Sequence, residues 1–205
     1  MGIVAAGSVN GFFLEVVEDA IKARRVEATG GATSYLVALL SDYTRPDTRA
    51  EEAMDRPLSF LLDEALHTPA AGERFDRLRA LGDGVLYTCG FFGESLEARG
   101  VDQAYVIGIG ATAYSAASTM LRVPAHEPTQ EGSFDVFGEL AGKFGSFVAV
   151  LTDVADGAIA GGVASSKGVL KLYERWLKTG SDRLAQALSA NGVVPLRGGP
   201  KGTMQ

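Results

Sequence analysis

Cysteine is nearly absent from this 205-residue sequence, in which Cys89 is the only one. A single thiol forms no intramolecular disulfide, and it rules out a zinc site built from several cysteines. Chains without disulfides are typical of reducing compartments, so we expect a cytoplasmic protein. Cys89 lies on an apolar stripe with Val85 and Phe92, which predicts a buried, unreactive thiol.

Histidine is almost as scarce, with His67 and His126 alone. Glu64 and His67 stand one helical turn apart, as in helical bundles that bind two iron ions. Such sites require a second pair of this kind and further carboxylates, so we expect no metal and no other cofactor. No G-x-S-x-G motif marks a nucleophilic serine. The sequence favours a protein without enzymatic activity, and it leaves open a catalytic site assembled from distant residues.

A net positive charge and strongly hydrophobic runs are also lacking. The net charge of −6 and the isoelectric point near 5.0 argue against binding to nucleic acid. Residues 103–121 form a run of 19 residues without charge, close to the length of a membrane span. This run contains serines and threonines and lacks basic flanks, which favours a buried helix over a membrane span. Residues 1–6 are apolar but lack the basic start and the long apolar core of a secretory signal, so we expect none in this segment.

Apolar residues recur at intervals of three and four along most of the chain, which predicts helices. We expect an all-α bundle of about seven or eight helices, with residues 103–121 as a buried, small-residue central helix. It should form a single domain over residues 1–195, followed by a flexible tail over residues 196–205.

Local signals place the helix boundaries. The expected boundaries lie near Thr29, Pro57, Gly100 and Gly180. One helix should run from Pro69 towards Gly100, where Gly82 and Gly84 allow a kink or a break. Residues 133–151 give the clearest helical pattern in the chain.

Three segments resemble small helical bacterial proteins with no assigned activity. They are YLVALLSDY (35–43), LYTCGFFGESLEARGVDQAYVIGIGATAY (86–114) and LYERWLKTGS (172–181). The resemblance implies an all-helical fold. Because these segments contain no catalytic motif, it assigns no functional residue.

The segment 108–113, GIGATA, fits the relaxed dinucleotide-binding pattern G-x-G-x-x-A. That motif needs a strand–helix–strand unit with an acidic residue ending a second strand about 20 residues on, and the sequence has no such strand there. An α/β nucleotide-binding enzyme that uses Gly108 and Gly110 is the third functional alternative. The favoured interpretation is a helix on which Gly108, Thr112 and Ala116 let neighbours approach closely.

Charge is unevenly distributed along the chain. Residues 166–205 carry a net charge of +5, and the remaining residues carry −11. The basic segment could dock an acidic protein partner or the acidic body of a second copy, or it could simply be a solvated helix face. The residues of this basic face are Lys167, Lys171, Arg175, Lys178 and Arg183.

Four phenylalanines could line an apolar pocket, although packing in the core is the usual explanation for such a stripe. They are Phe134, Phe137, Phe144 and Phe147. Our leading hypothesis is a non-enzymatic adaptor that acts through protein–protein contacts and self-associates as a homodimer. The alternative is a binding protein for an apolar small molecule in this pocket.

Overall fold

The computed structural model describes residues 7–43, 56–121, 135–161, 172–177, 180–191 and 193. Within these residues every regular element is an α-helix and none is a strand, which confirms the all-α fold. The chain groups into two compact units, Met1–Thr152 and Asp153–Gln205. Whether the two fold as the single domain expected over residues 1–195 stays a prediction, and the expected tail at 196–205 lies outside the described residues.

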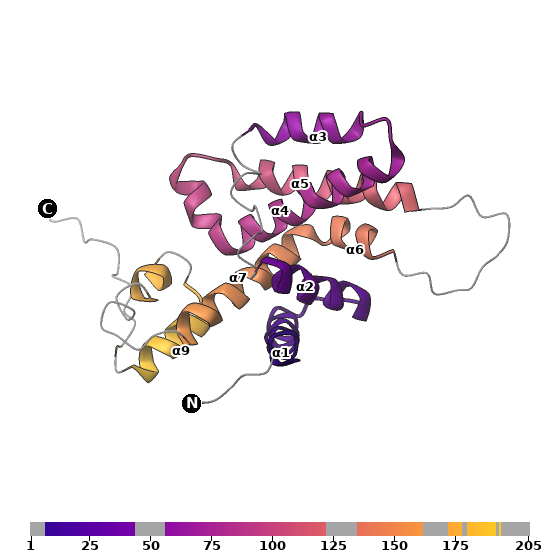
Figure 1. The fold of residues 1–205 in the computed structure, drawn as a ribbon. Coiled ribbons are helices and arrows are strands. Elements are labelled where there is room, and N and C mark those ends of the chain that lie inside the picture. Colours follow the sequence, from indigo (N-terminus) through magenta and orange to yellow (C-terminus); the bar gives the residue numbers. More distant parts are fainter. Residues whose placement is uncertain are drawn as a thin grey trace, which may run out of the picture. The chain divides into compact units, whose positions relative to one another are not determined.

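The first unit holds six complete helices and the beginning of a seventh. They are α1 (Gly7–Arg24), α2 (Gly30–Tyr43), α3 (Leu58–Leu66), α4 (Ala71–Ala98), α5 (Gln103–Leu121), α6 (Val136–Gly142) and α7 (Phe144–Gly161). Helices α3, α4 and α5 pack against one another, α6 packs on α5 and α2, and α1 packs on α2 (Figure 1). Helix α5 is therefore central in this unit, as its sequence predicted.

The helix boundaries follow the local signals. Helix α2 begins at Gly30 because the Thr29 hydroxyl oxygen accepts a hydrogen bond from the Ala32 amide at 3.2 Å. Helix α3 begins directly after Pro57. Gly100 follows α4 with a φ of +73°, a left-handed conformation that favours glycine. The expected boundaries at these positions are confirmed.

The predicted interruption of α4 is in the wrong place. The helix runs without a break through Gly82 and Gly84, and its backbone leaves helical geometry at Phe92, with φ −126° and ψ 19°. Beside this kink the Gln103 side-chain amide donates to the Cys89 carbonyl oxygen at 3.5 Å. Phe92, expected on the buried stripe, is 51% exposed, since the altered backbone takes it off the regular helical face.

The pattern over residues 133–151 predicted one helix, but the structure has two. Helix α6 ends at Gly142 and α7 begins at Phe144, with Lys143 between them at φ −114° and ψ 23°. The ammonium group of Lys143 donates to the Glu27 carbonyl oxygen at 2.5 Å and lies 3.2 Å from the Glu139 carboxylate. Because the apolar residues keep their spacing of three and four across Lys143, the periodicity does not reveal the break between α6 and α7.

At three glycines in the first unit, a side chain from another helix fills the space that a β carbon would need. A β carbon built on any of them would lie 2.4–2.5 Å from a neighbouring side chain, which is closer than real β carbons approach. The three pairs are Gly82 with Tyr114, Gly90 with Leu151, and Gly110 with Phe144. Gly82 thus admits the Tyr114 ring and does not bend α4.

The second unit is built from the end of α7, the helical residues 172–177 and α9 (Asp182–Ala190). Gly180, with φ +64°, separates the last two, as expected. The apolar core of this unit consists of Leu172, Trp176, Leu184 and Leu188. Asp156 is fully buried and accepts a hydrogen bond from the Arg175 guanidinium at 2.5 Å. Burial raises the pKa of Asp156 in spite of that partner.

Candidate functional site

Helix α5 is buried along one side and exposed along the other. Its buried residues include Val106, Ala113, Tyr114 and Ala117, and its exposed face contains Gly108, Thr112, Ser115 and Thr119. The expectation that this uncharged helix is buried nearly all round is therefore wrong. The Thr112 and Thr119 hydroxyls donate to backbone carbonyl oxygens one turn earlier, at 2.8 and 2.9 Å. Small polar side chains of this kind can face water without charge.

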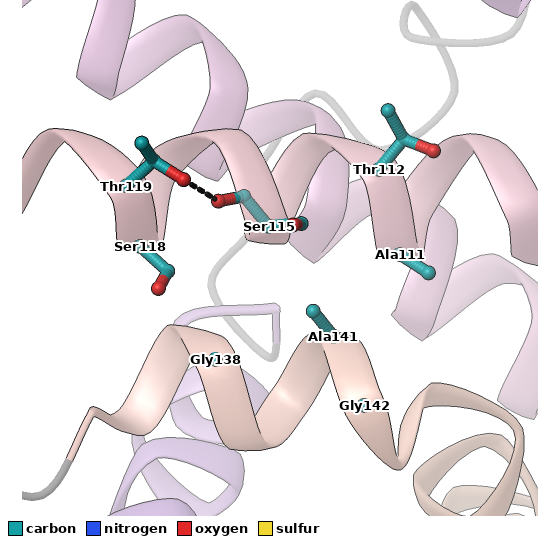
Figure 2. Close-up of a pocket in the computed structure, with 8 residues that line it drawn as sticks. All are labelled: Ala111, Thr112, Ser115, Ser118, Thr119, Gly138, Ala141 and Gly142. Atoms are coloured by element: carbon teal, nitrogen blue, oxygen red, sulfur yellow. Dashed lines mark hydrogen bonds between the residues drawn. The ribbon is translucent and has the colours of Figure 1, made fainter.

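A groove of about 510 Å³ lies between α5 and α6 (Figure 2). We call it the α5–α6 groove, and it is lined by Ala111, Thr112, Ser115, Ser118, Thr119, Gly138, Ala141 and Gly142. In Figure 2, Ala111 and Ser118 point from α5 towards α6, and Ala141 points from α6 into the space between the helices. No lining side chain is charged or larger than threonine. The groove thus offers short hydroxyl and methyl groups and exposed backbone.

One carboxylate joins the two walls of the groove. Asp135 precedes α6 and accepts a hydrogen bond from the Gly138 amide at 2.7 Å, as an N-cap. Its other oxygen accepts a hydrogen bond from the Ser118 hydroxyl on α5 at 2.5 Å. A β carbon on Gly138 would lie 2.4 Å from the Asp135 carboxylate, so a side chain there would displace the carboxylate from this position.

Glu139 fastens α6 to the start of α2. Its two carboxylate oxygens accept hydrogen bonds from the Thr29 amide at 3.1 Å and the Thr29 hydroxyl at 2.5 Å. The Lys143 ammonium also donates to Glu139, at 3.2 Å. Burial by itself would raise the pKa of Glu139, but these donors outweigh it and the pKa is lowered.

A second polar cluster joins α2, α4 and α5 inside the unit. The Tyr35 and Tyr114 hydroxyls both donate to the same oxygen of Asp83, each at 2.6 Å. Burial is the main cause that raises the pKa of both phenols and of Asp83. The Phe137 ring lies 5.3 Å from the Tyr35 ring and 5.7 Å from the Tyr114 ring, between centroids. This cluster therefore packs against α6, next to groove residue Gly138.

The phenylalanines predicted to line a pocket are core residues where they are described. Phe137, Phe144 and Phe147 are 9%, 2% and 0% exposed, and Phe134 lies outside the described residues. None of the three lines the α5–α6 groove. The apolar pocket stays a prediction.

The basic face is described only in part. Lys167, Lys171 and Lys178 lie outside the described residues. Arg175 points inward to Asp156, with 15% of its side chain exposed, so it contributes little positive charge to the surface. The Arg183 guanidinium lies 3.1 Å from the position of a β carbon on Gly157, against the end of α7. Docking through these five residues stays a prediction.

The glycine-rich motif does not form a loop. Gly108 and Gly110 both lie inside α5, and the apolar residues before them are helical, so the turn that a dinucleotide fingerprint requires is missing. The α/β alternative is therefore wrong for this segment. Gly110 is covered by Val85 and Phe144, whereas Gly108 faces open space.

The remaining chemical candidates are placed as follows. Glu64 pairs with Arg56 at 2.6 Å, and His67 lies 3.2 Å from Asp63. In the described part of the chain, no three His, Cys, Asp or Glu residues come together as a metal site would require. Cys89 is 1% exposed and burial raises its pKa to about 12, which confirms the predicted buried thiol.

Comparison with known proteins gives no family to which the chain can be assigned. No family model, curated protein or solved structure matches the chain. The similarity to small helical bacterial proteins stays a prediction. Among the described helices, none combines the length and the apolar character needed to cross a membrane. The fold and the groove define the chain as an all-α protein with an open, uncharged groove between two helices.

Proposed function

We propose that this protein is a non-enzymatic adaptor that acts through protein–protein contacts and self-associates through the α5–α6 groove. The observation that carries the proposal is the lining of the groove. Eight small, uncharged residues from two helices lie together along this open groove. Small side chains let the backbone of a partner helix approach closely, and their hydroxyls can accept hydrogen bonds from it.

The same lining argues against the competing functions. Sites for small molecules are mostly lined by apolar and aromatic side chains with a few placed polar groups, and the groove has no aromatic side chain. General acid–base catalysis needs a titratable group within hydrogen-bond reach of the substrate, and no lining residue is titratable. The adjacent Asp135 carboxylate already accepts hydrogen bonds from the Ser118 hydroxyl and the Gly138 amide. A protein helix fits this surface better than an apolar ligand or a reacting substrate.

The absence of charge on α5 makes this face suitable for contact with a second copy. At a net charge of −6, two copies repel each other. The exposed face of α5 has no charged residue, so two copies can meet there without placing like charges in contact. A two-fold contact would set the same groove of each copy against the other.

A charge placed in the groove tests the proposal. Ser115→Glu should weaken self-association at least about tenfold, equal to about 1.4 kcal/mol, because a two-fold contact brings two carboxylates together. Ser95→Glu is the matched control, since Ser95 is an exposed serine on α4 outside the groove. Sedimentation velocity over a wide concentration range measures the association, and circular dichroism verifies that both variants fold.

Three outcomes would overturn the proposal. One is a wild-type protein that stays monomeric over the whole concentration range, and another is equal weakening by Ser115→Glu and Ser95→Glu. The third is a native mass spectrum, of protein purified from its own cells, that shows a tightly retained small molecule on a monomer. That result would favour the small-molecule alternative.

A further inference from the structure

The Asp83 carboxyl group lies at the junction of three helices and is mostly buried, with 17% of its side chain exposed. Both phenol donors, Tyr35 from α2 and Tyr114 from α5, donate to its Oδ1 atom at 2.6 Å. Tyr114 is 0% exposed, so this junction is internal. Because Tyr35 lies on α2 and Asp83 lies on α4, the hydrogen bond between them links these two helices directly.

The charged groups near Asp83 stabilise its negative charge only weakly. The nearest cation is Arg79 on the same helix, whose Nε lies 3.8 Å from Oδ2 and whose side chain is 51% exposed. Water screens a cation as exposed as this one. From α2, Asp42 adds a like charge and Tyr43 adds only a phenol. Helix α6 contributes the apolar ring of Phe137.

We propose that Asp83 is a proton-sensitive latch on α2: uptake of a proton by its carboxyl group strengthens the attachment of α2 to α4 and α5, and release of the proton weakens it. Burying a charge without a close ionic partner costs free energy, and protonation removes this cost. A neutral carboxyl group keeps a carbonyl oxygen that can accept both phenol hydrogen bonds. The latch is independent of the groove and of self-association.

The direction of the effect follows from proton linkage. Burial is the largest influence on Asp83 and raises its pKa, while hydrogen bonds from Tyr114 and Tyr35 and the charge of Arg79 lower it only in part. When α2 detaches, Asp83 is exposed to water, so burial no longer raises its pKa to the same extent. The attached state then binds a proton more tightly than the detached state. Attachment is strongest below the ordinary carboxyl range and weakens as pH rises through the raised pKa of Asp83.

Hydrogen exchange of the α2 amides tests the latch in the full-length protein. After correction for intrinsic exchange rates, protection of α2 should rise when the pH is lowered from neutrality towards the carboxyl range. Asp83→Asn keeps an oxygen acceptor for the two phenols without a titratable charge, so α2 should lose its pH dependence in this range. The Glu139 carboxylate, which holds the start of α2 through Thr29, has a lowered pKa and titrates at lower pH. Asp76→Asn, an exposed change on the same helix, should keep the wild-type dependence.

Two results would overturn the proposal: α2 protection that falls on acidification, or Asp83→Asn that retains the wild-type pH dependence. A second measurement compares infrared difference spectra of the wild-type protein and Asp83→Asn, because buried Asp156 also has a raised pKa and gives a band in both. The carbonyl band that only the wild-type protein shows should appear at the pH where α2 protection rises. Clearly separate midpoints for the two changes would also refute the latch.

Discussion

The ring of Phe144 occupies the space that a side chain on Gly110 would need. A β carbon built on Gly110 lies 2.4 Å from Cζ of Phe144 and 2.7 Å from Cγ1 of Val85. Both neighbours are buried, at 2% and 1% exposure, so neither can move away at low cost. The absence of a side chain on Gly110 therefore lets α5 lie against α4 and α7.

Gly110→Ala should destabilise the protein by about 1–3 kcal/mol, because the added methyl group overpacks this contact. Gly108→Ala is the matched control on the same helix, since a β carbon there meets no atom within 4 Å. The control should stabilise the protein by about 0.5–1 kcal/mol through the higher helix propensity of alanine. Urea unfolding midpoints measure both changes. Shifts of the same sign would contradict the packing at Gly110.

This pair of glycines shows what the sequence could predict about α5 and what it could not. The run without charge, between Asp102 and Arg122, predicted the bounds of the helix correctly, and the Asp102 carboxylate accepts a hydrogen bond from the Ala104 amide at its start. The sequence did not show which side is covered. Gly108 and Gly110 look alike in the sequence, and only the approach of Phe144 from a distant segment distinguishes them.

The polar contacts could not be predicted for a related reason. Tyr35 and Asp83 are separated by 48 residues, and Thr29 and Glu139 by 110 residues. Helical periodicity reports which face of a helix is apolar, but it does not report which polar residue on that face meets a partner from another helix. Asp135 carries a local N-cap signal, an aspartate just before a helix, but the sequence predicted Ser133 as the cap of this segment.

Tyr114→Phe tests the buried polar cluster. The variant keeps the ring that packs against Phe137 and Phe144 and removes one of the two hydroxyls bound to Asp83. We expect a loss of stability of about 1–2 kcal/mol, since the buried carboxylate loses a donor. Tyr105→Phe is the control because Tyr105 is 52% exposed, and it should change stability by less than about 0.5 kcal/mol. Equal losses in the two variants would mean that the Tyr114 hydrogen bond contributes nothing specific.

Cys89 should be unreactive in the folded protein. Burial raises its pKa to about 12, so at neutral pH very little thiolate, the reactive form, is present. A thiol reagent such as DTNB should react far more slowly with native protein than with protein unfolded in urea. The ratio of the two rates is the measurement, and similar rates would show that the site opens readily.

Glu139→Gln tests the connection between α2 and α6 and has a predictable pH dependence. Glutamine places an NH2 group where one of the two carboxylate oxygens accepts from Thr29, and it loses the charge that Lys143 meets. At neutral pH we expect a loss of about 1–2 kcal/mol. Glu73→Gln, in the exposed pair with Arg77, is the control and should cost about 0.3–0.5 kcal/mol.

The cost of Glu139→Gln should shrink as the solution is acidified. The pKa of Glu139 is lowered in the folded protein, so its carboxylate contributes stability that is present above the ordinary glutamate pKa and is lost as pH falls through the lowered value. Urea midpoints of wild-type and variant protein at a series of pH values give this difference directly. Because Asp83 titrates in both proteins, its opposite effect cancels in the comparison. A difference that stays constant, or grows, towards acidic pH would show that the Glu139 carboxylate does not hold α6 against Thr29.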